Sequence, residues 1–268
     1  MPLAVCATPI GNLEDVTLRV LRELGEADLV LCEDTRRTRV LLDRHGVRTR
    51  LESYHRHNEA ARTSVALERL RRGERIALVS DAGLPGINDP GARLITATVA
   101  AGLPVTVLPG PSAVETALVA SGLLAERYQF VGFVPRRDAE RATFVQELAL
   151  YLHTLVAFES PRRLPATLRA LAEEMPDRPA VVCRELTKRF EHVERGTLSE
   201  LAIAFREPPP GEVTLVVGPA ALPERSVTRE SLEAVAELVA AGVPRRLAVD
   251  VVARLTHSSK NALYSASL

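Results

Sequence analysis

Short runs of apolar residues alternate with amphipathic stretches along the first half of the chain. The runs are typical of buried strands, and the stretches between them repeat at helical spacing, as at Leu18, Leu21 and Leu24. Strands separated by single helices predict βαβ units and a mostly parallel sheet. The expected strands are residues 3–7, 29–32, 75–80 and 104–108, and the expected helices are residues 14–24, 35–44, 90–101, 112–120 and a helix between Asn58, as N-cap, and Gly73.

A second cycle of the same pattern follows, and a tail with helical spacing only closes the chain. We therefore expect the α/β fold class, with one domain over residues 1–122, a second over 127–218 and a short helical segment over 226–268. The second cycle has expected strands at 128–134, 154–158, 180–184 and 213–217, helices at 139–151, 163–174 and 199–205, and tail helices at 229–241, 245–255 and 259–264. Residues 219–225 read as a linker.

The composition is that of an ordinary globular protein, with 46% hydrophobic and 25% charged residues in 268. No apolar run approaches the ~20 residues of a membrane span, and the first residues lack the pattern of a signal peptide, so we expect a cytoplasmic protein without a membrane partner. Cys6, Cys32 and Cys183 are scattered and lack a nearby histidine motif. We expect Cys6 and Cys32 in the core, and neither a metal site nor a disulfide.

Basic and acidic residues balance at 34 each, which argues against a protein that coats nucleic acid indiscriminately. All basic residues are arginine except Lys188 and Lys260. Codon bias explains this preference better than function does. Arginine nevertheless binds phosphate through paired hydrogen bonds and stacks on bases better than lysine does.

Turns rich in Gly, Pro, Asp and Ser fall at residues 8–15, 80–91, 109–113 and 208–212. In an open α/β sheet ligands bind beyond the carboxyl ends of the strands, where glycines allow backbone amides to approach them closely. A single turn of this kind is most simply a tight connection, but the set together favours a ligand site. The chain lacks GxxxxGK[ST], a helix-opening GxGxxG and GxSxG. These absences disfavour nucleoside triphosphates, a standard dinucleotide and a serine nucleophile.

Several of these segments together resemble a known family. TPIGNLEDVT, CEDTRRTRVLL, SDAGLPGINDPG and PGPSAVETALVASGL are similar to motifs of the tetrapyrrole methylase superfamily. FESPRR and RELTKRFE narrow the resemblance to the branch that 2′-O-methylates a cytidine of small-subunit ribosomal RNA. The likeness extends to SSKNALY near the C-terminus, and its motifs are specific in this order rather than singly.

The resemblance implies two α/β domains that hold S-adenosylmethionine between them, in a homodimer. Transferred by position, the donor-binding residues are Pro9, Asp81, Ala82, Gly83, Leu84, Ser112, Ala113, Phe158, Leu186, Gly211 and Glu212. Leu84 stands where the family usually has threonine, so this chain lacks a hydroxyl there and offers only its backbone. Ser112 also begins an expected helix, whose free N–H groups suit the carboxylate of the donor.

The sulfonium donor is already activated, so the enzyme chiefly aligns the reacting atoms. A ribose hydroxyl is a poor nucleophile and benefits from a base or a cation. Candidates are Glu185 and Lys188 in RELTK, with Asp34, Arg36 and Glu33 in CEDTRR as weaker ones. Lys188 is of interest because a lysine retained in an arginine-rich chain suggests a need for a compact charge or a neutral amine. No residue is assigned as the general base.

RNA contact requires a local basic surface. The phosphate-binding candidates are Arg36, Arg37, Arg39, Arg56, Arg136, Arg137 and Arg162. Tyr54, His55 and His57 would stack on splayed bases. A solvated helix face is the alternative interpretation of the arginine-rich stretch. The expected partner is small-subunit ribosomal RNA, in an assembled particle.

Two other functions stay open. A methylase of the same fold that acts on a tetrapyrrole ring carbon would need a cleft suited to a large macrocycle. RELTK, the arginine-rich stretch and the helical tail count against it. The second alternative keeps the fold without catalysis, as a donor-binding or RNA-binding module.

Overall fold

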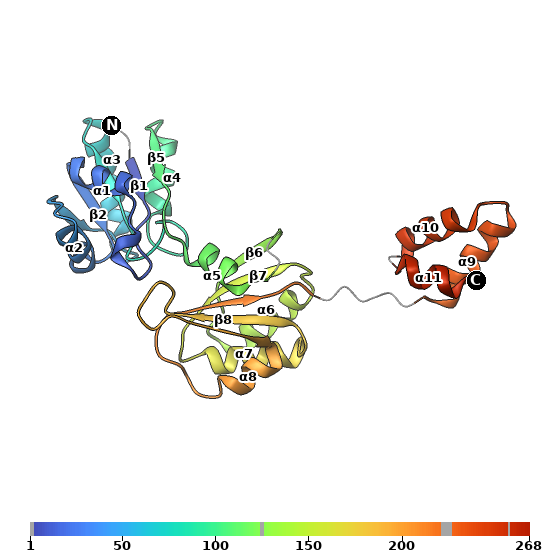
Figure 1. Ribbon diagram of the computed structural model, residues 1–268. Coiled ribbons are helices and arrows are strands. Elements are labelled where there is room, and N and C mark those ends of the chain that lie inside the picture. The colour runs from blue at the N-terminus through green and yellow to red at the C-terminus, as the bar shows by residue number, and fades with distance from the viewer. Residues whose placement is uncertain (1–2, 124–125, 221–226, 257) are drawn as a thin grey trace. The chain divides into compact units, whose positions relative to one another are not determined.

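The computed structural model describes residues 3–123, 126–220, 227–256 and 258–268. The chain divides into two compact units, one ending at Pro219 and the other beginning at Ala220. Within its described residues the first unit contains two five-stranded sheets with their helices, and the second contains three helices (Figure 1).

The first sheet is fully parallel, in the order β3-β2-β4-β1-β5. Alternate residues of its strands face opposite layers: Ala4 and Cys6 pack with α1 and α2, whereas Leu3 and Val5 pack with α3 and α4. The elements are β1 (Leu3–Cys6), a 3-10 turn (Leu13–Asp15), α1 (Leu18–Glu26), β2 (Leu29–Cys32), α2 (Thr35–Arg44), β3 (Leu51–Ser53), α3 (Glu59–Arg71), β4 (Ile76–Leu78), α4 (Ala92–Ala100), β5 (Val105–Leu108) and α5 (Ala113–Ser121).

The second sheet is mixed, in the order β6-β7-β10-β8-β9. Only β6 and β7 pair in parallel, and β10 runs antiparallel to both β7 and β8. The elements are β6 (Tyr128–Phe133), α6 (Asp138–Ala149), β7 (Thr154–Glu159), α7 (Leu164–Glu174), β8 (Pro179–Arg184), β9 (His192–Thr197), α8 (Leu198–Ala204) and β10 (Val213–Val217). The expected α/β class is confirmed, and parallel pairs predominate over the two sheets together, while the second sheet adds antiparallel neighbours.

Two strands were not predicted from the sequence. β3 is only three residues long, and β9 (HVERGT) carries a single large aliphatic residue, Val193, so neither gives a hydrophobic run. The first helix also begins later than expected, at Leu18, because Thr17 caps it by accepting the N–H of Val20. Asn58 lies at the N-cap position of α3 as expected, but its side chain accepts the N–H of His55 instead of capping the helix.

Helix α5 packs its apolar face on the second sheet. Val114, Ala117 and Leu118 lie in one buried cluster with residues of β7, β8 and β10, and Ile10 belongs to the same cluster. The first residue of this helix follows β5 of the first sheet directly through a short turn. α5 therefore connects the two sheets through buried apolar contacts.

The three cysteines are free and buried, which confirms the prediction for Cys6 and Cys32. Burial raises the pKa of Cys6 to about 12 and that of Cys183 to about 11, so these thiols stay protonated at neutral pH. Among the described residues no group of His, Cys, Asp and Glu side chains is arranged to hold a metal ion.

The second unit consists of α9 (Arg229–Ala240), α10 (Arg245–Thr256) and α11 (Lys260–Ala266). Its core is small and is formed by Val235, Ala248, Val249, Val252 and Leu263 with Ala253 at the edge. The predicted linker over 219–225 and the first residue of the predicted tail segment lie mostly outside the described residues. No helix in the described part of the chain has the length and apolarity needed to cross a membrane.

A buried arginine, Arg178, stabilises one end of the second sheet by hydrogen bonds to backbone carbonyls. Arg178 is only 6% exposed and donates to the carbonyl oxygens of Gly218 at 2.8 Å, Tyr151 at 2.8 Å and His153 at 2.9 Å. Tyr151 and His153 lie in the connection between α6 and β7, and Gly218 follows β10. Without the guanidinium these carbonyls would lose their partner inside the protein.

Replacing Arg178 with methionine is therefore expected to lower the free energy of unfolding by about 2–4 kcal/mol, because several buried carbonyls lose a donor. Urea unfolding followed by circular dichroism measures this. Arg169→Met, on the exposed face of α7, is the matched control and should change stability by less than about 0.5 kcal/mol. Equal stability of the two variants would contradict the role of Arg178.

Candidate functional site

The main cleft is a cavity of about 510 Å³ in the first unit. Strand ends from both sheets line it. Because β10 runs antiparallel to β7 and β8, its first residue, Val213, lies beside Glu159 and Arg184 at the ends of those strands. The lining segments are the turn 81–84 and residues 87–89 after β4, residues 112–114 at the start of α5, residues 158–161 at the end of β7, and residues 212–214 at the start of β10, together with Ile10, Glu33, Arg37, Phe133, Cys183 and Leu186.

The turn after β4 is held in place by the segment after β1. Thr8 and Gly83 exchange backbone hydrogen bonds at 2.8 and 3.0 Å, and the Thr8 hydroxyl donates to the Ser80 carbonyl at 3.0 Å. Gly83 has a φ of +78°, which a residue with a Cβ rarely adopts. The backbone conformation of this turn therefore explains why the sequence motif has a glycine at position 83.

Asp81 links two further elements to this turn. One carboxylate oxygen accepts the backbone N–H of Asp34 at 3.0 Å, and the other lies 3.3 Å from a guanidinium nitrogen of Arg37. Arg37 itself lines the main cleft, so this predicted RNA-binding residue faces the predicted donor site. The start of α2 is thereby held against the turn.

The segment Arg184-Glu185-Leu186-Thr187-Lys188 has an unusual backbone. Glu185 and Thr187 have φ values of +51° and +65°, in the left-handed region that residues other than glycine and asparagine avoid. Two glycines permit its packing. A Cβ on Gly11 would lie 2.5 Å from Cγ of Lys188, and a Cβ on Gly211 would lie 2.4 Å from Cγ of Glu185. The segment is thus wedged between the two predicted turns at residues 8–15 and 208–212.

Lys188 lies in a network with two carboxylates, one of which, Glu212, lines the main cleft. Its ammonium donates to Glu185 at 2.9 Å and to Glu212 at 2.8 Å, and Glu185 also accepts the backbone N–H of Glu212 at 2.8 Å. The Glu212 N–H and then the Lys188 ammonium lower the pKa of Glu185. Burial opposes protonation of Lys188, but its bonds to Glu212 and Glu185 outweigh burial and raise its pKa. Both catalytic candidates are therefore charged and paired, and Lys188 is a compact cation rather than a neutral amine.

Lys188 lines an adjoining cavity of about 360 Å³, together with Pro9, Gly11 and residues of α2. Asp81, Ala82, Arg37 and Glu212 line both cavities, so the two adjoin at these side chains. Glu185 lines neither cavity. Its carboxylate accepts hydrogen bonds from the Lys188 ammonium and from the backbone N–H of Glu212.

The second candidate pair, Asp34 and Arg36, lines neither cavity. Asp34 accepts from the guanidinium of Arg36 at 2.7 Å, and the Arg36 side chain is 89% exposed. The hydrogen bonds from Arg36 hold the pKa of Asp34 well below its usual range. The structure thus brings Asp34 and Arg36 together, and no hydrogen bond or ion pair among the described residues joins them to Lys188 or Glu185.

Most of the predicted donor-binding residues meet in one place. Asp81, Ala82, Gly83, Leu84, Ser112, Ala113, Phe158, Leu186 and Glu212 all line the main cleft. Pro9 lines the adjoining cavity, and Gly211 touches Glu185 without lining either. Ser112 makes no side-chain cap on α5 and donates to Glu115 instead, which leaves the first turn of that helix without a side-chain acceptor from its N-cap.

Asp89 is a carboxyl that the sequence did not single out. It lies in the main cleft with Glu33 and Asp81. Burial and the nearby carboxylate of Glu33 raise the pKa of Asp89 to about 6, and burial with the Asp81 carboxylate raises that of Glu33. Its place in SDAGLPGINDPG was visible in the sequence, but its partial burial beside two other acids was not.

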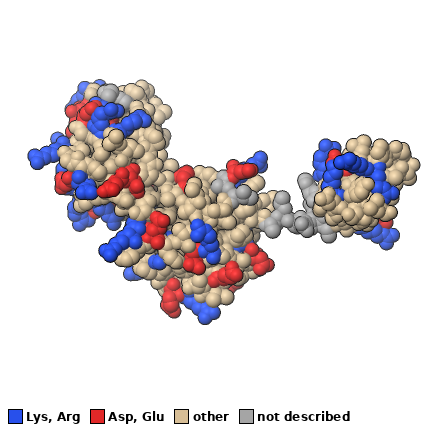
Figure 2. All heavy atoms as spheres, viewed as in Figure 1, with Lys and Arg blue, Asp and Glu red and all other residues tan. Residues whose placement is uncertain are grey.

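The predicted RNA-binding arginines are all exposed to solvent. Arg39, Arg56, Arg136 and Arg162 are exposed, and Arg137 pairs with Glu140 at 2.9 Å. On the face shown in Figure 2, basic and acidic side chains are interspersed. Tyr54 is 1% exposed, and its hydroxyl bonds Thr63 at 2.9 Å. The prediction that Tyr54 stacks on a base is wrong, because the ring belongs to the core.

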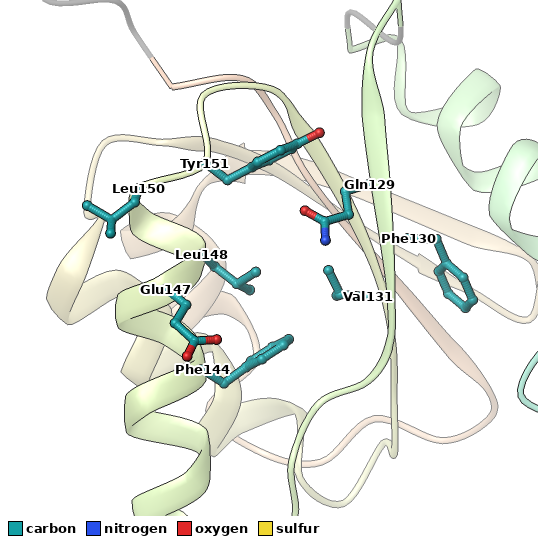
Figure 3. Close-up of a pocket in the computed structure, with 8 residues that line it drawn as sticks. All are labelled: Gln129, Phe130, Val131, Phe144, Glu147, Leu148, Leu150 and Tyr151. Carbon is teal, nitrogen blue, oxygen red and sulfur yellow. The ribbon is translucent and has the colours of Figure 1, made fainter.

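A further cavity, of about 530 Å³, lies between β6 and α6 (Figure 3). Figure 3 shows Phe144, Leu148 and Tyr151 along one side and Val131 opposite them, while Phe130 projects from the other side of its strand. Its lining is mainly apolar with a single carboxylate, Glu147, and includes none of the predicted site residues. Most of the predicted donor-binding residues gather instead in the main cleft and the adjoining cavity.

Comparison with known families and proteins shows the family to which the chain belongs. Residues 2–202 match the family described as tetrapyrrole (corrin/porphyrin) methylases. A protein named ribosomal RNA small subunit methyltransferase I from Mesorhizobium japonicum is 43% identical over 265 residues, covering 98% of this chain and 90% of that protein. Its namesake from Mycobacterium tuberculosis is 46% identical over 244 residues, covering 90% of this chain and 85% of that protein.

Solved structures show the same fold at lower identity. The methyltransferase CobJ has a TM-score of 0.64 and 23% identity, covering 82% of this chain and 94% of that one. Uroporphyrin-III C-methyl transferase from Thermus thermophilus, complexed with S-adenyl homocysteine, has a TM-score of 0.58 and 20% identity, covering 81% of this chain and 97% of that one.

Gly11→Ala tests the close packing of Gly11 against the segment that carries Lys188. The new Cβ would lie 2.5 Å from Lys188 Cγ, 2.7 Å from Thr187 Oγ1 and 2.8 Å from the carbonyl oxygen of Leu186, so the segment must shift. We expect a loss of about 1–3 kcal/mol in the free energy of unfolding, measured with urea. Gly25→Ala in α1, where the nearest atom is 3.8 Å away, is the control and should be neutral or stabilising. A neutral Gly11→Ala would show that the close packing is not needed.

Proposed function

The chain belongs to the tetrapyrrole methylase family, and we propose that it transfers the methyl group of S-adenosylmethionine to the ribose 2′-hydroxyl of a cytidine in small-subunit ribosomal RNA. The observation that carries this proposal is the near full-length similarity to proteins named ribosomal RNA small subunit methyltransferase I, at 43% and 46% identity. The main cleft supplies a place for the donor, because the residues transferred by position from the family converge there.

The residues of the main cleft fit the chemical groups of the donor. Phe158 and Leu186 offer apolar surface for a purine ring, and Phe130 and Phe133 support Phe158 with ring centroids 4.8 and 5.5 Å away. The start of α5 offers N–H groups to a carboxylate. Carboxylates of Asp81 and Glu212 offer acceptors for hydroxyl and ammonium groups.

When bound, the sulfonium supplies an electrophilic methyl group that needs no further activation. The chain then has to bind the donor, exclude water and direct the acceptor hydroxyl along the axis of displacement. Lys188 is held as a cation beside Glu212, which lines the main cleft, and itself lines the adjoining cavity. Its role in this proposal is to stabilise negative charge that develops on the acceptor oxygen.

Exposed arginines support RNA as the acceptor. Arg37 and Arg56 lie beside the cleft, and Arg56 donates to the carbonyl oxygen of Asn88, which lines it. We propose that Arg36, Arg39, Arg136, Arg137 and Arg162 contact phosphates farther along the RNA. The proposed enzyme acts in the cytoplasm on an assembled small-subunit particle, as a homodimer, and its domains are those predicted at 1–122, 127–218 and 226–268.

The tetrapyrrole alternative is favoured by the description of the matching family and by a fold neighbour that acts, by its title, on uroporphyrin-III. That neighbour is 20% identical, whereas the curated relatives with an RNA name exceed 40%. The non-catalytic alternative is disfavoured because the turns of the main cleft and the charged Lys188 network are all present. RNA methylation is therefore the preferred function.

Asp81→Asn tests the donor site. The amide keeps an oxygen that can accept the N–H of Asp34 but loses the charge, so the variant should fold while binding the donor more weakly. We expect the Kd for S-adenosylmethionine, measured by titration calorimetry at neutral pH, to rise about tenfold or more. Asp138→Asn on the exposed start of α6 is the control. Equal affinity of wild type and Asp81→Asn would place the donor elsewhere.

The product identifies the acceptor. Purified protein, tritiated S-adenosylmethionine and either small subunits or naked small-subunit RNA should give label that survives digestion as a 2′-O-methylcytidine nucleoside. Label on a base, on protein or on a porphyrinoid would reject the proposed function. Comparison of the two RNA substrates decides whether the particle is required.

A further inference from the structure

Asp89 lies on the part of the main cleft that the predicted donor residues do not use. When the donor-binding set is set aside, the polar side chains that remain in the lining near the turn after β4 are Glu33, Arg37, Asn88 and Asp89. These side chains border the same cavity as the donor turn. They are therefore polar groups within this cavity that an acceptor beside the donor can contact.

The turn that carries Asp89 is held firmly. Asn88 has a φ of +63°, a left-handed conformation that asparagine tolerates best after glycine. The guanidinium of Arg56 donates to the Asn88 carbonyl at 2.6 Å, and Pro90 restricts the backbone on the other side. Asp89 is therefore presented from a fixed backbone rather than from a free loop.

The acid–base candidates outside this group are engaged elsewhere. Glu185 is bonded to Lys188 and to the Glu212 N–H, and Asp34 is bonded to Arg36. Each of these pairs stabilises the charged carboxylate and makes it a weak proton acceptor. Asp89 is half-buried, and the carboxylates of Glu33 and Asp81 repel its negative charge, while the Ser80 hydroxyl and the Arg56 guanidinium favour it. Arg37 forms an ion pair with Asp81 at 3.3 Å, and the Arg56, Arg37 and His55 side chains favour the charged form of Glu33.

We propose that Asp89 is a catalytic residue that accepts the proton of the ribose 2′-hydroxyl during methyl transfer, an inference that rests on the proposed function. The hydroxyl oxygen forms its bond to the methyl carbon and passes its proton to a carboxylate oxygen of Asp89. The bond between methyl carbon and sulfur breaks, and its electron pair stays on sulfur, so the positive charge of the sulfonium ends as the proton on Asp89. Charge and atoms balance without a further reactant.

The raised pKa of Asp89 suits this role. With a pKa of about 6, most of the carboxyl is ionised at neutral pH, yet it binds a proton more strongly than an ordinary aspartate does. The rate should therefore fall as the pH drops through about 6, where Asp89 becomes protonated. Without such a base, the loss expected for general base catalysis is about 10²- to 10⁴-fold.

The experiment compares wild type, Asp89→Asn and Glu33→Gln in the tritium assay on small subunits between pH 5 and 8.5. Asp89→Asn should lower kcat about 100-fold or more and remove the acid limb near pH 6, while the Kd for S-adenosylmethionine changes less than about threefold. Glu33→Gln removes the nearest like charge, so its acid limb should move to lower pH. Glu68→Gln on the exposed face of α3 should match wild type.

Stability gives a readout that does not need the reaction. Because folding raises the pKa of Asp89, the folded protein holds a proton between about pH 4 and 6 that the unfolded chain releases, and stability falls as the pH rises through that window. Asp89→Asn removes this effect. Its Tm relative to wild type should therefore be higher at pH 7.5 than at pH 4, whereas loss of a merely structural contact would lower Tm at both.

The outcomes separate the two proposals. If wild type gives no 2′-O-methylcytidine on any RNA substrate, the proposed function is rejected. If wild type gives that product and Asp89→Asn keeps its rate and its acid limb, Asp89 is not the proton acceptor. An acid limb that stays in place in Glu33→Gln also overturns the assignment.

Discussion

The packing of α5 on the second sheet is the contact on which the site depends. Val114, Ala117 and Leu118 are buried against Val156, Val181, Cys183 and Val216, and Ser112 at the start of the same helix lies in the main cleft. Burial of the apolar face of α5 thus fixes the position of its N-terminus in the main cleft. The cleft needs both sheets, and α5 is the element that follows the last strand of one and buries its face on the other.

A strained segment completes the cleft from the second sheet. Glu185 and Thr187 adopt left-handed backbone conformations, which cost energy that surrounding contacts must offset. The Asn12 N–H donates to Thr187 at 3.0 Å, and Glu191 accepts from the Thr187 N–H at 2.6 Å. Through these bonds Lys188 is directed to Glu212 instead of to solvent. The strain and the charge network are therefore two parts of one arrangement.

Much of the fold followed from hydrophobic periodicity, because β1, β2, β4 and β5 are short apolar runs between amphipathic helices. The periodicity could not show β9, whose residues pair by backbone bonds with little apolar character, or the place of β10 between β7 and β8. The motifs located the turns of the cleft. They could not show that Lys188 lines a cavity whereas Asp34 does not, nor that Asp89 is half-buried beside Glu33. Both facts depend on contacts between distant segments.

The central position of β10 has a consequence for biosynthesis. β7 and β8 join the same sheet only through β10, the last strand of the first unit to leave the ribosome. Until residues 213–217 emerge, the nascent chain carries β7 and β8 with open edges toward the missing strand. Unpaired edges invite association with other chains. Stalled or shortened translation products of this protein should therefore depend on chaperones far more than the finished chain does.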